Sequence, residues 1–143
     1  MRVGFIGLGN VGAKLAGSLL RNGFDLVVLD LDREAAAPLL EQGARWAESA
    51  RTLTRDSDVV ITCLPSPAAS AAVLEEADGV LEGMGDGRIW AEMSTTDESE
   101  VQRLGEKVAA AGGHPVDCPV SGGCHRAATG NISIFAGCER QVF

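Results

Sequence analysis

Residues 3–12 read VGFIGLGNVG, and the organisation of the whole chain follows from this stretch. A short apolar run, typical of a buried strand, leads directly into a G-x-G-x-x-G pattern. The pattern is weak evidence alone, but here a predicted strand precedes it and a predicted helix opens within it. An acid, Asp30, follows eighteen residues after the last glycine, close to the spacing of dinucleotide-binding units.

Each glycine of this pattern has a physical task in a phosphate-binding turn. Gly7 permits the tight turn, Gly9 lets the backbone approach a pyrophosphate, and Gly12 lets the helix pack closely on the strand. The start of the helix then offers free N–H groups to the phosphates. The alternative is a plain glycine turn between a strand and a helix. The predicted cofactor-binding residues here are Gly7, Leu8, Gly9, Asn10, Val11 and Gly12.

Asp30 at the end of the second apolar run predicts which nicotinamide cofactor is bound. Its carboxylate can accept both hydroxyls of an adenosine ribose, and it repels a 2′-phosphate. Leu31 follows it, where an arginine would welcome that phosphate, so we expect NAD in preference to NADP, although Arg33 nearby works against this preference. The alternative for Asp30 is an N-cap of the next helix, but Asp32 is better placed for that role.

Outward from this unit, apolar runs alternate with helical stretches to the end of the chain. The pattern predicts an α/β fold of Rossmann type, a doubly wound and mostly parallel sheet in one domain, residues 1–143. Ligands of such sheets bind beyond the carboxyl ends of the strands. Strands are expected at 3–9, 24–30, 44–49, 58–65, 88–94, 114–120 and 131–137, and helices at 10–23, 32–43 with a break at Pro38, 49–57, 68–76 and 96–113.

Composition excludes several partners and sites. The net charge of −8 argues against nucleic acid or an anionic membrane as the main partner. No apolar run is long enough to span a membrane, and no cleavable signal opens the chain, so we expect a cytoplasmic protein. Cys63, Cys118, Cys124 and Cys138 lack the spacing of a zinc site, so we expect four free thiols and no bound metal.

Three later loops, CLPSP, EMSTTDES and CPVSGG, each follow an apolar run and should open onto the same edge of the sheet. GFIGLGNVG precedes these loops in the sequence and AATGNISIFAG follows them. In this order, the five stretches resemble the N-terminal domain of the β-hydroxyacid dehydrogenase family. The similarity covers essentially the whole chain and is greatest to the branch of 3-hydroxyisobutyrate dehydrogenase and semialdehyde reductases. It implies hydride transfer between a nicotinamide cofactor and a small 3-hydroxy acid or semialdehyde.

The resemblance also implies roles for single residues. Leu64 and Pro65 resemble the dipeptide that lines the cofactor, and Thr95 resembles the threonine beside the nicotinamide. The substrate loop, in which a hydroxyl and backbone amides hold a carboxylate, corresponds to Ser121, Gly122 and Gly123. Alternatives stay open for three of these positions: Pro65 ends a strand, Thr95 or Thr96 caps the next helix, and Ser121 is a turn hydroxyl.

The catalytic lysine of the family belongs to a long helix that follows this domain, and the chain ends before it. Lys14 and Lys107 are predicted on helices and do not follow strand ends, so no catalytic residue is expected within this chain. The family's all-helical second domain, which completes the pocket and the usual dimer, is absent as well. We therefore expect a truncated, inactive half that associates into homo-oligomers. The alternatives are a stand-alone dinucleotide-binding module and a fragment of an imine-reductase-type enzyme.

Overall fold

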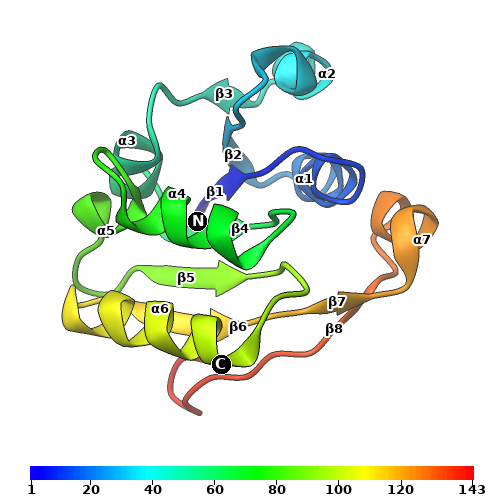
Figure 1. Cartoon of the computed structure of the whole chain (residues 1–143). Helices are drawn as coiled ribbons and strands as arrows, with labels where there is room; N and C mark the ends of the chain where they lie inside the picture. Colours follow the sequence, from blue (N-terminus) through cyan, green and yellow to red (C-terminus); the bar gives the residue numbers. More distant parts are fainter.

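A computed structural model describes residues 1–143, and it contains a six-stranded parallel sheet with the strand order β3-β2-β1-β4-β5-β6 (Figure 1). The chain starts in the middle of this sheet and builds outward in two directions, which is the doubly wound arrangement. The strands are β1 (Arg2–Ile6), β2 (Asp25–Leu29), β3 (Arg45–Trp46), β4 (Val59–Thr62), β5 (Ile89–Glu92) and β6 (His114–Asp117). The predicted fold class is therefore confirmed.

The unit from β1 to α1 (Gly12–Arg21) forms as the glycine pattern predicts. β1 pairs with β2 in the register Val3↔Leu26 and with β4 in the register Val3↔Val59, so it is buried between two neighbours. Gly23 follows the C-cap residue Asn22 and has φ +82°, the left-handed conformation that glycine commonly adopts after a helix.

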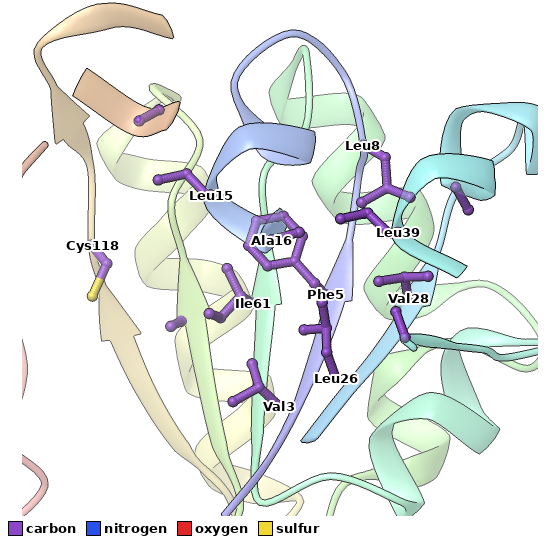
Figure 2. Packing of buried hydrophobic residues seen from close by; sticks show 14 of the residues in the cluster. Val3, Phe5, Leu8, Leu15, Ala16, Leu26, Val28, Leu39, Ile61 and Cys118 are labelled. Carbon is purple, nitrogen blue, oxygen red and sulfur yellow. The ribbon is translucent and has the colours of Figure 1, made fainter. Parts of the chain in front are cut away.

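Two apolar layers cover the two faces of the sheet. One layer joins alternate strand residues such as Phe5, Val28 and Ile61 to Leu15 of α1 and Leu39 of α2, and Figure 2 shows these side chains together. The opposite layer packs the other strand residues against α3 (Ala50–Arg55), α4 (Pro67–Glu75), α5 (Val80–Gly83) and α6 (Glu98–Ala110). Helices on both faces leave the carboxyl ends of the strands as the open edge.

The middle of the chain contains one break that was predicted and one helix that was not. The helix expected at 32–43 is divided, as Pro38 predicts, into a 3-10 turn η1 (Arg33–Ala36) and α2 (Ala37–Glu41), because proline is accepted only in the first turn of a helix. The glycine-rich stretch 78–87, where no helix was predicted, contains α5. Gly83 of this helix lies so close to α3 that a Cβ would be 2.4 Å from the carbonyl oxygen of Arg51.

The last third of the chain also departs from expectation. The strand expected at 114–120 divides into β6 and β7 (Val120–Ser121), and residues 131–137 contribute only β8 (Ser133–Ile134). β7 and β8 form a separate antiparallel pair outside the main sheet. The predicted substrate loop runs into a helix that sequence reasoning did not find, α7 (Gly123–Thr129), which packs on α1. Residues 140–142 form a turn near the end of the chain.

Candidate functional site

A cleft of about 1210 Å³ lies beyond the carboxyl ends of the central strands. Its lining comes from the segments that follow β1, β2, β3, β4 and β5, which the parallel topology brings to one edge. The glycine-rich turn after β1 lies in the middle of this series, because β1 is central in the sheet. The cleft therefore has two arms, one past β2 and β3 and the other past β4 and β5.

The glycine-rich turn presents unpaired donors to this cleft. The backbone N–H groups of Gly9, Asn10 and Val11 have no acceptor within the chain, and no side chain caps the start of α1. Free N–H groups at a helix N-terminus form an anion-binding site, since the helix dipole adds to their partial positive charge. Gly9 and Asn10 are also exposed. The turn has the donors that a pyrophosphate requires.

The three glycines of the turn differ in what surrounds them. A Cβ at Gly7, which has φ +97°, would lie 2.3 Å from the carbonyl oxygen of Cys63, and a Cβ at Gly12 would lie 2.0 Å from that of Gly7. Gly9 has no heavy atom within 4 Å of its Cβ position and faces the cleft. Gly7 and Gly12 are thus required by the fold itself, while Gly9 keeps open a space that a ligand can enter.

Asp30 is held in place at the first arm by two backbone donors. The N–H of Leu8 donates to its Oδ2 at 2.5 Å and the N–H of Asp32 donates to its Oδ1 at 2.9 Å. A carboxylate has about four acceptor sites, so two remain for ligand hydroxyls. Asp32 caps η1 by accepting from the N–H of Glu34, so Asp30 does not act as the helix cap. Leu8 contributes through its backbone, because its side chain is buried in the core.

The first arm is acidic and carries one aromatic wall. Trp46 of β3 lines it, and the guanidinium of Arg33 lies over the indole ring, 5.3 Å from the centroid. The lining contains no lysine and no arginine. Arg51 is nearby, but it is paired with Asp78 at 2.7 Å and with Glu82 at 3.2 Å. Asp30 and Glu48, which follow β2 and β3, supply the carboxylates of this arm, and Glu76 and Asp78, which follow α4, add two more to the cleft lining.

The second arm contains the residues predicted beside the nicotinamide. Leu64, Pro65 and Thr95 all line it, and Thr95 is exposed. The cap of α6 is Asp97, whose carboxylate accepts from the N–H groups of Ser99 and Glu100, so Thr95 is not needed for capping. β4 ends at Thr62, three residues before Pro65.

Cys63 lies on the wall of the second arm and is a poor nucleophile there. Burial, with a smaller contribution from the negative charge of Glu92, raises the pKa of the Cys63 thiol to about 11. The thiolate is the reactive form of cysteine, so this side chain acts as an apolar wall at neutral pH.

The predicted substrate loop lies beside the cleft rather than in its lining. Val120 lines the second arm, and Ser121, Gly122 and Gly123 continue from it with exposed positions. Gly122 and Gly123 have φ values of +135° and +72°, conformations that favour glycine. The N–H of Gly122 has no acceptor within the chain. The loop therefore projects an unpaired donor near the second arm.

The lysine and histidine side chains do not line the cleft. Lys14 donates to the carbonyl oxygen of Asn10 at 3.1 Å, at the glycine-rich turn, and Lys107 is paired with Glu75 across α4 and α6. Neither lysine lines the cleft, and the same is true of His114 and His125. The chain also has no group of three or more His, Cys, Asp or Glu side chains arranged to hold a metal ion.

Several lining residues were missed by sequence reasoning. Trp46 lies on a two-residue edge strand, which was predicted without its role in the cleft. Ser94 lines the second arm directly before the predicted Thr95. Its position at the end of an apolar strand was the only feature of the sequence that could have indicated this. Other missed positions come from α4 and the turn after it, which lack a recognisable pattern: Ala69, Ala72, Val73, Glu76, Ala77, Asp78 and Gly79.

Comparison with known proteins agrees with this geometry. The family described as the NAD binding domain of 6-phosphogluconate dehydrogenase matches residues 2–143. Among curated proteins, mitochondrial 3-hydroxyisobutyrate dehydrogenase of Rattus norvegicus is 35% identical over 99% of this chain and 42% of its own length. The chain spans about half the length of the curated relatives it matches.

Solved structures show the same relationship. The structure of Psf3 in complex with NADP+ and 2-OPP superimposes with a TM-score of 0.93 at 32% identity, over 97% of this chain and 49% of that one. An imine reductase from a Pseudomonas species superimposes with a TM-score of 0.81 at 28% identity, over 87% of this chain and 43% of that one.

No helix of the structure has the length and apolar character needed to cross a membrane.

Proposed function

Because the chain belongs to the family of the NAD binding domain of 6-phosphogluconate dehydrogenase, we propose that it is the cofactor-binding half of a dehydrogenase. The complete enzyme would transfer hydride between a nicotinamide cofactor and a small 3-hydroxy acid, similar to 3-hydroxyisobutyrate, or the corresponding semialdehyde. One observation carries this proposal furthest. The uncapped start of α1 and the fixed carboxylate of Asp30 face a single cleft, as a dinucleotide requires.

The two arms of the cleft suggest how the cofactor is held. The N–H groups of Gly9, Asn10 and Val11 would bind the pyrophosphate at the centre. Asp30 would accept the hydroxyls of the adenosine ribose in the first arm, so the nicotinamide would lie in the second arm beside Leu64, Pro65 and Thr95. When bound, the nicotinamide supplies the group that accepts or donates hydride. The chain's own residues bind and orient it.

We further propose that the cofactor is NAD rather than NADP. The cleft lining contains four carboxylates and no basic side chain, so the lining would repel a 2′-phosphate. Arg51 is already paired with Asp78 and Glu82, and Arg33 lies over Trp46. The related Psf3 structure contains NADP+, so the preference depends on these particular side chains.

The cofactor proposal is tested by titrating the chain with NAD and with NADP under identical salt conditions, by calorimetry or by Trp46 fluorescence. We expect the tighter binding with NAD. Asp30→Asn should shift the ratio of the two affinities towards NADP by about tenfold, the effect of ~1.4 kcal/mol of removed repulsion. Asp32→Asn is the matched control, because it removes the same charge from a residue outside the cleft. Tighter binding of NADP to the unmodified chain would contradict the role of Asp30.

The substrate loop is proposed to hold a carboxylate with the hydroxyl of Ser121 and the amides of Gly122 and Gly123. The positive φ values of both glycines and the free N–H of Gly122 support this role. We expect the 143-residue chain to show no turnover with NAD and 3-hydroxy acids, since neither lysine lines the cleft. Clear turnover would contradict the proposal that a lysine outside these residues is needed.

The two alternatives make different predictions. A stand-alone dinucleotide-binding module would gain nothing from the Ser121–Gly123 loop, so Ser121→Ala would have no effect on the activity of any longer form of the protein. An imine-reductase-type enzyme would reduce cyclic imines in such a longer form and would not oxidise hydroxy acids. Because the chain is structurally similar to an imine reductase, both cyclic imines and hydroxy acids should be tested as substrates.

A further inference from the structure

A buried carboxylate lies directly behind the second arm of the cleft. Glu92 is the last residue of β5, and its side chain is fully buried, with an exposed fraction of 0%. Its Oε1 accepts from the N–H of Ser94 at 2.9 Å and also from the Ser94 hydroxyl. Its Oε2 is buried and has no partner in the chain. A buried carboxyl group with an unpartnered oxygen is costly, so a role is expected for it.

The Ser94 hydroxyl connects this carboxylate to the wall of the cleft. Because it donates its single proton to Glu92, its lone pairs are left to accept, and the N–H of Leu64 donates to them at 2.8 Å. Leu64 and Ser94 both line the second arm. The chain of hydrogen bonds thus joins the end of β5 to the loop that follows β4.

We propose that Glu92 is a positioning residue for the nicotinamide end of the cofactor. Acting through Ser94, it fixes the direction of the Leu64 N–H and hence the position of the Leu64–Pro65 wall. This role rests on the proposed function, because it assumes that the second arm receives the nicotinamide. Charge-directed hydrogen bonds are stronger than neutral ones, so a carboxylate holds the serine hydroxyl in one rotamer.

The experiment compares Glu92→Leu, Ser94→Ala and Glu92→Gln with the unmodified chain. Binding is measured by calorimetry with NAD and with ADP-ribose, which has the pyrophosphate and both riboses but no nicotinamide. Exchange of the Leu64 amide proton is followed by NMR, a measurement that needs no cofactor. Ser70→Ala is the control, because Ser70 is also buried, has an unpartnered hydroxyl and lies outside the cleft lining.

Glu92→Leu and Ser94→Ala should weaken NAD binding at least fivefold, leave ADP-ribose binding within twofold and speed Leu64 exchange. Glu92→Gln keeps an oxygen acceptor for Ser94 and should restore both NAD affinity and Leu64 protection. Ser70→Ala should change neither. Equal losses for NAD and ADP-ribose in Glu92→Leu would show a general structural effect and overturn the proposal, as would unchanged Leu64 exchange. If the unmodified chain bound neither NAD nor NADP, the proposed function would fail, while Leu64 exchange would still test the network.

Discussion

Alanine substitution at two glycines of the same turn should separate binding from folding. The Cβ of Gly12→Ala would lie 2.0 Å from the carbonyl oxygen of Gly7, a backbone atom that cannot move without displacing β1 from α1. Overpacking of this kind costs about 1–3 kcal/mol. Gly9→Ala meets no heavy atom within 4 Å, so its effect on the free energy of unfolding should stay below about 1 kcal/mol.

The two substitutions should weaken cofactor binding for different reasons, Gly9→Ala by direct obstruction and Gly12→Ala through loss of folded structure. A methyl group at Gly9 would occupy the space through which a pyrophosphate reaches the N–H groups of Gly9, Asn10 and Val11. A hydrogen bond to a charged group contributes about 1.5–3 kcal/mol, so losing one should weaken NAD binding roughly ten- to a hundredfold. Any loss of binding in Gly12→Ala should instead accompany a lower melting temperature.

The assay combines thermal unfolding by circular dichroism with calorimetric NAD titration at a temperature where both variants are folded. For a chain near this size, each kcal/mol lowers the melting temperature by about 2–4 °C. Gly12→Ala should therefore melt several degrees lower, and Gly9→Ala should melt close to the unmodified protein. The reasoning is refuted if Gly9→Ala binds NAD with unchanged affinity, or if it unfolds as readily as Gly12→Ala.

Three further predictions concern pH, thiol reactivity and association. Hydrogen bonds from Arg103 and Lys107 lower the pKa of Glu75 from 4.5 to about 2. The contribution of Glu75 to stability should therefore be present above pH 4.5 and disappear as the pH falls towards 2. The difference in melting temperature between the unmodified chain and Glu75→Gln should shrink over that range, and a constant difference would contradict the pairing. Burial raises the pKa of Cys63 and of Cys118 from 9.0 to about 11. Each should therefore have about a hundredfold less thiolate than an ordinary cysteine, and iodoacetamide at pH 8 should alkylate both slowly. Rapid labelling of either thiol in the folded chain would contradict the raised pKa values. The exposed apolar side chains of the β7–β8 pair and the last residues should cause homo-oligomers or aggregates in sedimentation experiments, and a monomer at high concentration would oppose that expectation.

The first half of the fold could be read from the sequence because its signals are local. The apolar run before Gly7, the glycine spacing and the acid at Asp30 are each set by neighbouring residues, and parallel pairing follows from strand–helix alternation. Even the break before α2 had a local sign in Pro38. The placement of Leu64, Pro65 and Thr95 at one edge followed from the same topology.

The parts that sequence could not give depend on contacts between distant segments. α5 forms in a glycine-rich stretch because Gly83 packs against α3, a contact that no local pattern shows. β7 leaves the main sheet to pair with β8, and this choice depends on partners twelve and fourteen residues away, Ser133 for Ser121 and Ile134 for Val120. The hydrogen bonds from Glu92 through Ser94 to Leu64 connect the ends of two strands. They could not be predicted without knowing that β4 and β5 are neighbours in the sheet.

The amide resonances of the glycine-rich turn offer the most direct test that this cleft binds a dinucleotide at the start of α1. In a ¹⁵N-labelled chain titrated with NAD, the account predicts large, saturable shifts for the amides of Gly9, Asn10 and Val11, which have no acceptor in the free chain. Smaller shifts should follow at Leu64 and Thr95. Unchanged resonances for all three turn amides at saturating NAD, or shifts confined to a different surface, would contradict it.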